Sequence, residues 1–309
     1  MTQMDKPLCG FLNVLKPPGM SSAHVVGAVR RMLGGAKVGH AGTLDPEASG
    51  VLPLMVGKAA RLFDYMQDKE KAYVTEVAFG AATDTQDAQG AAIATGENYP
   101  DDAAVLAALP AFTGAIMQTP PMYSAIKVDG QRLYALARKG KTVDVPERIV
   151  HVESIEILGD EPDHGVRIRV ACGKGTYIRS ICDDLGKLCG CPAHMRSLVR
   201  TRSGVFTLAE AMTLEEARML AAEGRLAEKR MALDAPIGHL PRMEAPEHLA
   251  KQVAAGAALP LEAMAVRNHE IPEEGSIMRI YLKGVFWGIA ERREGRIIWR
   301  AQIPPEEQA

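Results

Sequence analysis

Residues 166–188 read VRIRVACGKGTYIRSICDDLGKL and predict a strand joined directly to a helix. The apolar side chains in the first half of this stretch are Val166, Ile168, Val170 and Cys172. They recur at every second position, which is the spacing of a half-buried strand. A helix is expected over 178–188, immediately after a short turn that contains two glycines. A strand and a helix so close in sequence indicate that both kinds of element share one core.

The segments on either side of this unit continue the mixture of strands and helices. Strands or extended segments are expected over 10–16, 71–79, 91–95 and 122–127. Helices are expected over 22–33, 59–66, 101–109 and 132–139, and in two acidic stretches between 214 and 230. Because turns of hairpin length join many elements, and strands do not alternate strictly with helices, we expect an α+β fold with a mixed, largely antiparallel sheet. Glycine and proline interrupt 37–54, which therefore reads as a loop.

The C-terminal part of the chain predicts a second, smaller unit. Three prolines between 233 and 246 are typical of a linker. Strands are then expected over 277–282, 285–290 and 296–299. We therefore expect a first domain over 1–235 and a small β-rich module over 246–309.

Composition excludes several classes of protein. With 309 residues, 47% of them hydrophobic and 24% charged, the chain resembles an ordinary globular protein rather than a disordered, fibrous or disulfide-stapled one. The cysteines number five, which is odd, and no apolar run of signal-peptide length follows Met1, so we expect a reducing, cytoplasmic environment. No stretch approaches the roughly 18 consecutive apolar residues of a membrane span.

The net charge of −2 hides two basic segments. Residues 1–61 carry a net +4 and residues 164–204 a net +6, while acidic stretches elsewhere offset them. A single segment of this kind is usually a solvated face. Two separate segments are consistent with a basic cleft, which is the usual feature of a nucleic-acid-binding surface.

Two familiar motifs are absent or incomplete. Gly173-Lys174-Gly175-Thr176 lacks the Ser or Thr that must follow the lysine of a phosphate-binding loop, which argues against an ATPase or GTPase. The candidate ligands for zinc are Cys182, Cys189, Cys191 and His194. Their spacing lacks paired C-x2-C knuckles, so we interpret the cysteines as buried structural thiols and expect no metal.

Residues 39–53 read GHAGTLDPEASGVLP and place Asp45 immediately before a proline. An Asp-Pro pair by itself is usually a turn. Here the neighbouring glycines allow close approach of a ligand to the backbone, and the prolines that follow Asp45, at 46 and 53, stiffen the loop. A rigid loop that presents one carboxylate is suited to nucleophilic catalysis.

These residues resemble the TruB-type tRNA pseudouridine synthases. Five stretches match that family in order, namely 10–22, 39–53, 71–90, 118–127 and 172–186. The resemblance implies a catalytic domain of the pseudouridine synthase type followed by a PUA-like β-barrel module. It implies an isomerase that converts uridine 55 in the T-arm of tRNA to pseudouridine without a cofactor. It further implies a monomer with no obligatory protein partner.

The resemblance also implies roles for particular residues. Asp45 is the family's catalytic aspartate, Arg179 its ion-pair partner, and Tyr73 the tyrosine that stacks on the target base and is a candidate to assist proton removal at carbon 5. The residues implied in substrate binding are His40, Leu198, Tyr177 and Lys16. Whether Asp45 attacks the base, attacks the sugar or initiates elimination to a glycal stays open at this point.

A uridine inside a folded T-loop must be extruded before it can react. Basic residues flank the matched stretches on both sides, namely Lys16, Arg30, Arg31 and Lys37, and Arg196, Arg200 and Arg202. We expect them to hold RNA phosphates. Two alternatives remain: a guide-RNA-dependent relative that modifies ribosomal RNA, and an RNA-binding chaperone that helps tRNA fold. The chain lacks a Lys-rich tail, and the set of Asp45, Tyr73 and Arg179 is intact, so a stand-alone tRNA enzyme is favoured.

Overall fold

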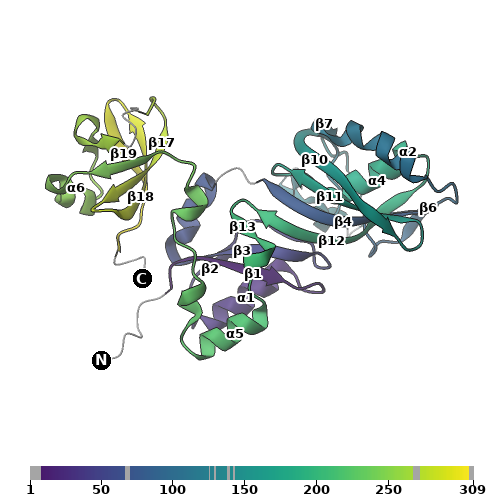
Figure 1. Ribbon diagram of the computed structural model, residues 1–309, viewed down its shortest axis with the longest axis horizontal. Helices are drawn as coiled ribbons and strands as arrows, with labels where there is room; N and C mark the ends of the chain where they lie inside the picture. The colour runs from purple at the N-terminus through teal and green to yellow at the C-terminus, as the bar shows by residue number, and fades with distance from the viewer. Residues whose placement is uncertain are drawn as a thin grey trace.

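The computed structural model describes residues 8–66, 70–124, 126–128, 130–137, 140–141, 143–266 and 272–305. Its largest element is a mixed sheet that runs through the middle of the molecule (Figure 1). In spatial order the strands are β1 (Gly10–Lys16), β3 (Ser49–Val56), β12 (Ala193–Ser203), β4 (Lys71–Phe79), β11 (Gly165–Cys172), β10 (Arg148–Glu161) and β7 (Gly114–Gln118). The short strands β2 (Val38–His40) and β13 (Phe206–Thr207) pair with β3 and β12. Of these pairings, only that of β12 with β3 is parallel.

Helices and short hairpins cover and extend this sheet. The helices are α1 (Ser22–Met32), α2 (Asp102–Ala108), α3 (Leu133–Ala137), α4 (Ile178–Leu188) and α5 (Leu214–Ala222). The 3₁₀ turns of this region are η1 (Gly57–Tyr65), η2 (Leu109–Phe112), η3 (Leu208–Glu210) and η4 (Leu226–Lys229). The hairpins are β5 (Ala81–Thr83) with β6 (Ala92–Thr95), and β8 (Lys127–Val128) with β9 (Gln131–Arg132). The main core lies where β4, β11 and β12 pack against α2 and α4.

The C-terminal module is a second sheet that lies beyond η1 in Figure 1, at the opposite end of the molecule from α2 and α4. Its strands in spatial order are β15 (Leu259–Pro260), β19 (Arg296–Gln302), β18 (Val285–Arg293), β17 (Ile277–Leu282), β14 (Arg242–Ala245) and β16 (Ala265–Val266). Its helical pieces are η6 (Glu247–Leu249), α6 (Ala250–Ala254) and η7 (Leu261–Ala263), and η5 (Ala235–Ile237) precedes it. The expected α+β class with a small β-rich C-terminal module is therefore confirmed.

The C-terminal module packs firmly against the rest of the chain. One hydrophobic cluster combines Phe11 and Val51 of the main sheet with Tyr281 and Phe286 of the module. The Tyr281 hydroxyl donates a hydrogen bond of 2.5 Å to the Asp234 carboxylate, just outside the module. These contacts join the two sheets through buried apolar surface and a charge-assisted hydrogen bond.

Several predicted elements are confirmed, including β1, β4 and α4, whose bounds match the predicted ranges 10–16, 71–79 and 178–188. The predicted extended segment 122–127 and helix 132–139 are described only in part, because residues 125, 138 and 139 lie outside the described ranges. No helix in the parts of the chain that the structure describes is long and apolar enough to cross a membrane.

Two loop predictions are wrong. The segment 37–54 contains β2 and most of β3, and nearly every residue of β3 is buried. A strand buried on both faces is a continuous apolar run without period-two alternation, so its sequence does not resemble a surface strand. The predicted linker 233–246 contains β14, which pairs in parallel with β17 inside the second sheet.

Candidate active site

Asp45 lies in the loop between β2 and β3 and pairs with Arg179 in the first turn of α4. Arg179 Nε is 3.0 Å from Asp45 Oδ2, and Arg179 Nη2 donates to Asp45 Oδ1 at 3.3 Å. The pairing is bidentate, so it fixes the orientation of the carboxylate as well as its distance. The Asp45 side chain is 37% exposed and that of Arg179 only 5%, so a ligand can reach the carboxylate while its partner stays enclosed.

Arg179 is held from two further segments. It donates to the carbonyl oxygen of Thr85 at 3.1 Å and to that of Tyr123 at 3.0 Å. Its Nη1 also lies 3.9 Å from Asp87 Oδ2. A guanidinium with this many fixed acceptors has one accessible position, and the Asp45 carboxylate is therefore oriented by a rigid partner.

The pKa of Asp45 is set by opposing effects of burial and of its charged neighbours. Burial raises the pKa of Asp45 above its ordinary value, the Arg179 guanidinium opposes that rise, and the nearby Asp87 carboxylate adds to it. The ion pair thus favours the carboxylate but does not cancel the effect of burial.

Ser22 and Lys16 hold the backbone of the Asp45 loop on one side. The Ser22 hydroxyl, at the start of α1, accepts from the Leu44 amide at 2.9 Å and donates to the Leu44 carbonyl oxygen at 3.1 Å. Lys16 Nζ donates to the carbonyl oxygens of Pro17 at 2.8 Å, Met20 at 2.5 Å and Pro46 at 2.7 Å.

Lys16 was expected to bind substrate and RNA phosphate, and the structure corrects this prediction. Its side chain is fully buried, and its three ammonium donors are all used on backbone carbonyls. Burial lowers the pKa of Lys16 to about 8 although Glu47 and Asp45 favour the charged form. Lys16 therefore shapes the loop instead of contacting a ligand.

Arg200 was also expected to hold phosphate, and it too is fully buried. Its Nε donates to Val51 at 2.7 Å, and its Nη atoms donate to Gly42 at 3.1 Å and Thr43 at 3.3 Å, in each case to the carbonyl oxygen. The phosphate role of Arg200 is therefore wrong. The outward-lying Arg196 and Arg202 form ion pairs with Glu76 at 2.6 Å and Glu70 at 3.2 Å, and they remain partly exposed.

Tyr73 and Leu198 join the Asp45 loop through the apolar core. Both belong to the cluster that includes Leu44, the residue before Asp45. Tyr73 lies opposite Arg200 in the β4–β12 register. Burial raises the pKa of Tyr73, and Arg200 opposes this effect. An apolar wall beside a reachable carboxylate is suited to a nucleobase.

His40 and Tyr177 occupy different positions relative to this group. His40, at the end of β2, accepts a 3.4 Å hydrogen bond from the Gly42 amide on Nδ1, and burial together with Arg200 lowers its pKa. Its ring is therefore a neutral group with the proton on Nε2. Tyr177 precedes α4, where its backbone exchanges two hydrogen bonds with the Gln118 side chain, at 2.8 and 3.0 Å. None of the contacts described for Tyr177 involves Asp45.

Sequence reasoning missed the loop at 83–87 as part of the site. Gln86 adopts a positive φ of 62°, which is uncommon for a residue other than glycine. Its side chain donates to Asp183 at 3.0 Å and accepts from Ser180 at 3.0 Å, both on α4. The loop is thereby fixed to the helix that carries Arg179. The run of polar residues at 83–87 was the available signal.

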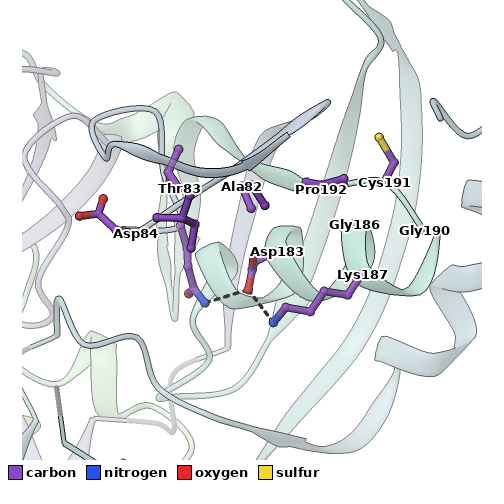
Figure 2. A pocket seen from close by; sticks show the side chains of 12 residues that line it. Ala82, Thr83, Asp84, Asp183, Gly186, Lys187, Gly190, Cys191 and Pro192 are labelled. Carbon is purple, nitrogen blue, oxygen red and sulfur yellow. Dashed lines mark hydrogen bonds and ion pairs between the residues drawn. The ribbon is translucent and has the colours of Figure 1, made fainter. Parts of the chain in front are cut away.

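The two cavities described do not include Asp45. Figure 2 shows the smaller one, of about 440 Å³, where Asp183 accepts from Gln86 and forms an ion pair with Lys187 at 2.7 Å. The larger one, of about 570 Å³, lies beside it around Pro120. Among the described residues there is no group of three or more His, Cys, Asp or Glu side chains that could hold a metal ion. The cysteine thiols are free, and Cys182 lies inside the core 4.0 Å from the Thr75 hydroxyl.

The chain is similar to proteins of one enzyme family. Residues 30–178 match the model of the TruB family pseudouridylate synthase N-terminal domain, and residues 179–240 match that of the tRNA pseudouridylate synthase B C-terminal domain. The tRNA pseudouridine synthase B of Aromatoleum aromaticum is 43% identical over 282 residues, which are 91% of this chain and 88% of that relative. The protein of the same name from Geobacillus thermodenitrificans is 45% identical over 262 residues, 82% of this chain and 86% of the relative.

Solved structures show the same fold at lower sequence identity. A chain of a Cbf5-Nop10-Gar1 complex superposes with a TM-score of 0.72 and 24% identity, covering 100% of this chain and 92% of that chain. A chain of an archaeal box H/ACA sRNP Nop10-Cbf5 complex gives the same TM-score of 0.72 at 23% identity, covering 98% of this chain and 88% of that chain. At such identities the likeness concerns the fold alone.

Proposed function

Because the chain belongs to the TruB family of pseudouridine synthases, we propose that it isomerises uridine 55 in the T-loop of tRNA to pseudouridine. The observation that carries the proposal is the bidentate pair of Asp45 and Arg179, at 3.0 and 3.3 Å, beside the apolar side chains of Tyr73 and Leu198. The relatives named above are tRNA enzymes, which favours tRNA over a guide-RNA-dependent reaction on ribosomal RNA.

The reaction is an isomerisation and is balanced without a redox partner. The bond between N1 of uracil and C1′ of the ribose breaks, the detached base rotates, and C5 bonds to C1′. The hydrogen on C5 leaves as a proton, and N1 gains one. Three routes are open, in which the carboxylate adds to the base, adds to the sugar or initiates elimination to a glycal. Each route needs only one carboxylate.

We assign Asp45 as the group that attacks or abstracts, because it is the exposed member of the ion pair. Arg179 orients it and favours its ionised form. Tyr73 and Leu198, which share one apolar cluster, would enclose the extruded uracil, and in this proposal Tyr73 stacks on the base and assists proton removal at C5. His40 would present its Nε2 hydrogen to the extruded nucleotide.

The substrate element in this proposal is the T-arm, bound by a monomer in the cytoplasm without a protein partner. The partly exposed Arg196 and Arg202 are candidates for phosphate contacts, because their ion pairs with carboxylates leave guanidinium surface accessible. We propose a catalytic domain over 1–235 and place β14 with the PUA-like module, because β14 pairs with β17.

The test is Asp45→Asn assayed on an unmodified tRNA transcript labelled with tritium at C5 of uridine. We expect release of tritium to fall by at least about 10⁴-fold while tRNA binding is retained, because the amide keeps the shape and loses the nucleophile. Asp64→Asn, an exposed carboxylate of η1, is the matched control and should behave as the wild type.

Substrate choice is read in the same assay. Turnover of a tRNA transcript without added guide RNA separates the tRNA enzyme from a guide-dependent one. Equal rates on the isolated T-arm stem-loop and on full tRNA would place recognition in the arm. Undiminished turnover by Asp45→Asn would refute the role of Asp45. Binding and refolding of tRNA by the wild type with no product would indicate the chaperone instead.

A further inference from the structure

Gln86 lies in the chain between two residues that contact Arg179. The carbonyl oxygen of Thr85 accepts from Arg179 at 3.1 Å, and the Asp87 carboxylate lies 3.9 Å from the same guanidinium. These two groups limit where the guanidinium can lie, and Arg179 in turn orients Asp45 through its two contacts with the carboxylate. A shift of Gln86 would therefore move both groups at once.

The Gln86 side chain fastens this segment to α4 at two points. Its Nε2 donates to Asp183 Oδ2 at 3.0 Å, and its Oε1 accepts from the Ser180 hydroxyl at 3.0 Å. Ser180 and Asp183 are three residues apart, which places them on one face of the helix, and both are buried. Figure 2 shows that Asp183 also pairs with Lys187, at 2.7 Å. Both ends of the amide are thus bound to groups that are themselves fixed.

The backbone of Gln86 is unusual for its residue type. Its φ of 62° lies in the left-handed region, which favours glycine or asparagine over glutamine. The backbone is held there by two hydrogen bonds, from its amide to the carbonyl oxygen of Thr83 and from the Met195 amide to its carbonyl oxygen, both at 3.1 Å. A costly conformation that persists points to a role for the side chain that it presents.

We propose that Gln86 is a positioning residue, which clamps the segment 83–87 to α4 and so fixes the orientation of Arg179. The proposal deepens the function inferred above and rests on it. Arg179 belongs to α4, so the clamp holds the acceptors of the guanidinium in place relative to the helix that carries it. Asp45 comes from a different loop and meets a partner with one orientation, which is what precise placement of a reacting carboxylate requires.

Gln86→Asn separates the side-chain clamp from the backbone conformation. Asparagine is favourable at this φ, but it is one methylene shorter, so contacts of 3.0 Å with α4 are lost. We expect the single-turnover rate constant of tritium release to fall by about 10- to 100-fold with tRNA binding unchanged. Gln89→Asn, at an exposed position of the same loop, is the matched control and should behave as the wild type. A wild-type rate for Gln86→Asn would overturn the proposal.

A double-mutant cycle with Arg179→Lys shows whether Gln86 acts through Arg179. In the Arg179→Lys background the orientation of the cation is already lost, so Gln86→Asn should lower the rate constant by only about twofold or less. A residue that merely stabilises the fold would lower the melting temperature and leave the two effects on the rate additive. Additive effects would therefore refute the positioning role.

A pair of substitutions tests the contact itself. Gln86→Glu places a second carboxylate against that of Asp183, and the two repel when both are ionised, so the rate at pH 8 should fall as it does in Gln86→Asn. When Asp183→Asn is added, its amide can donate to the carboxylate that Gln86→Glu introduces, and the contact is restored with its polarity reversed. We expect the double variant to recover most of the lost rate, and a double variant as slow as Gln86→Glu would contradict the clamp.

Failure of this proposal is distinct from failure of the proposed function. If Asp45→Asn keeps its activity, the proposed function fails. If Asp45→Asn is inactive while Gln86→Asn turns over at the wild-type rate, only the positioning role of Gln86 is refuted.

Discussion

Replacement of Arg179 by lysine tests the central ion pair without changing the charge of the site. In the wild type, Arg179 makes two charge-assisted contacts with Asp45 and donates to the carbonyl oxygens of Thr85 and Tyr123. A lysine ammonium can keep at most one of the two contacts with the carboxylate in this geometry. The variant therefore isolates the orientation of Asp45 from its electrostatic environment.

The expected magnitudes follow from these contacts. A hydrogen bond to a charged group contributes about 1.5–3 kcal/mol, so loss of one from the reacting carboxylate should lower kcat by roughly 10- to 150-fold. The two carbonyl contacts also involve the charged guanidinium, so loss of one of them should cost about 1.5–3 kcal/mol, which corresponds to a fall in melting temperature of about 3–12 °C for a domain of this size.

The assay is single-turnover tritium release from tRNA, with melting followed in parallel by calorimetry. Arg218→Lys, an exposed pair with Glu215 on α5, controls for the exchange of arginine for lysine at the surface. Removal of the cation in Arg179→Ala should also move the acid limb of the kcat profile to higher pH, because the Arg179 guanidinium then no longer opposes the effect of burial on the Asp45 pKa. A folded Arg179→Lys enzyme with wild-type kcat would refute the reasoning.

Two further predictions concern stability. The pKa of Lys16 is about 8 in the folded protein and 10.5 in the unfolded chain. Between these pH values the unfolded chain binds more protons than the folded protein does. The contribution of Lys16 to the free energy of unfolding therefore rises with pH, by roughly 3 kcal/mol across this range. Urea denaturation at pH 7.5 and 9.5 should show that the free energy of unfolding of the wild type rises relative to that of Lys16→Met. A difference between the two proteins that does not change with pH would contradict this. Tyr281→Phe removes the 2.5 Å hydrogen bond to Asp234 and should cost about 1.5–3 kcal/mol, measured as a lower melting temperature and faster proteolysis at 238–242. Unchanged melting and proteolysis would show that the apolar contacts alone hold the module.

Elements with a clear period were predictable from the sequence. The helix α4 and the strand β4 match their predicted bounds because one face of each is buried and the other is polar or half-buried. The strand β3 was missed because its apolar residues are buried on both faces and a proline lies among them. The burial of β3 on both faces depends on its neighbours β1, β2 and β12, which are distant in sequence or separated from it by a loop.

The roles of individual cations were the least predictable part of the site. Lys16 and Arg200 read in the sequence as members of two basic segments, as Arg196 and Arg202 do. The structure divides them, because the first two are fully buried against backbone carbonyls and the last two are partly exposed. The sequence does not distinguish a buried lysine or arginine from an exposed one, and only the acceptors around the charge determine what it binds.

The sequence by itself determined the mixed α+β class, the stiff loop that presents Asp45 and, through resemblance, the pairing with Arg179. These follow from local periodicity, from the backbone preferences of glycine and proline, and from motifs contiguous in the chain. Only the tertiary structure decided that Arg200 joins the Asp45 loop to strand β3 and that Lys16 supports the same loop from within. The physical reason is that burial and hydrogen-bond partners come from segments far apart in sequence, brought together when the apolar core forms.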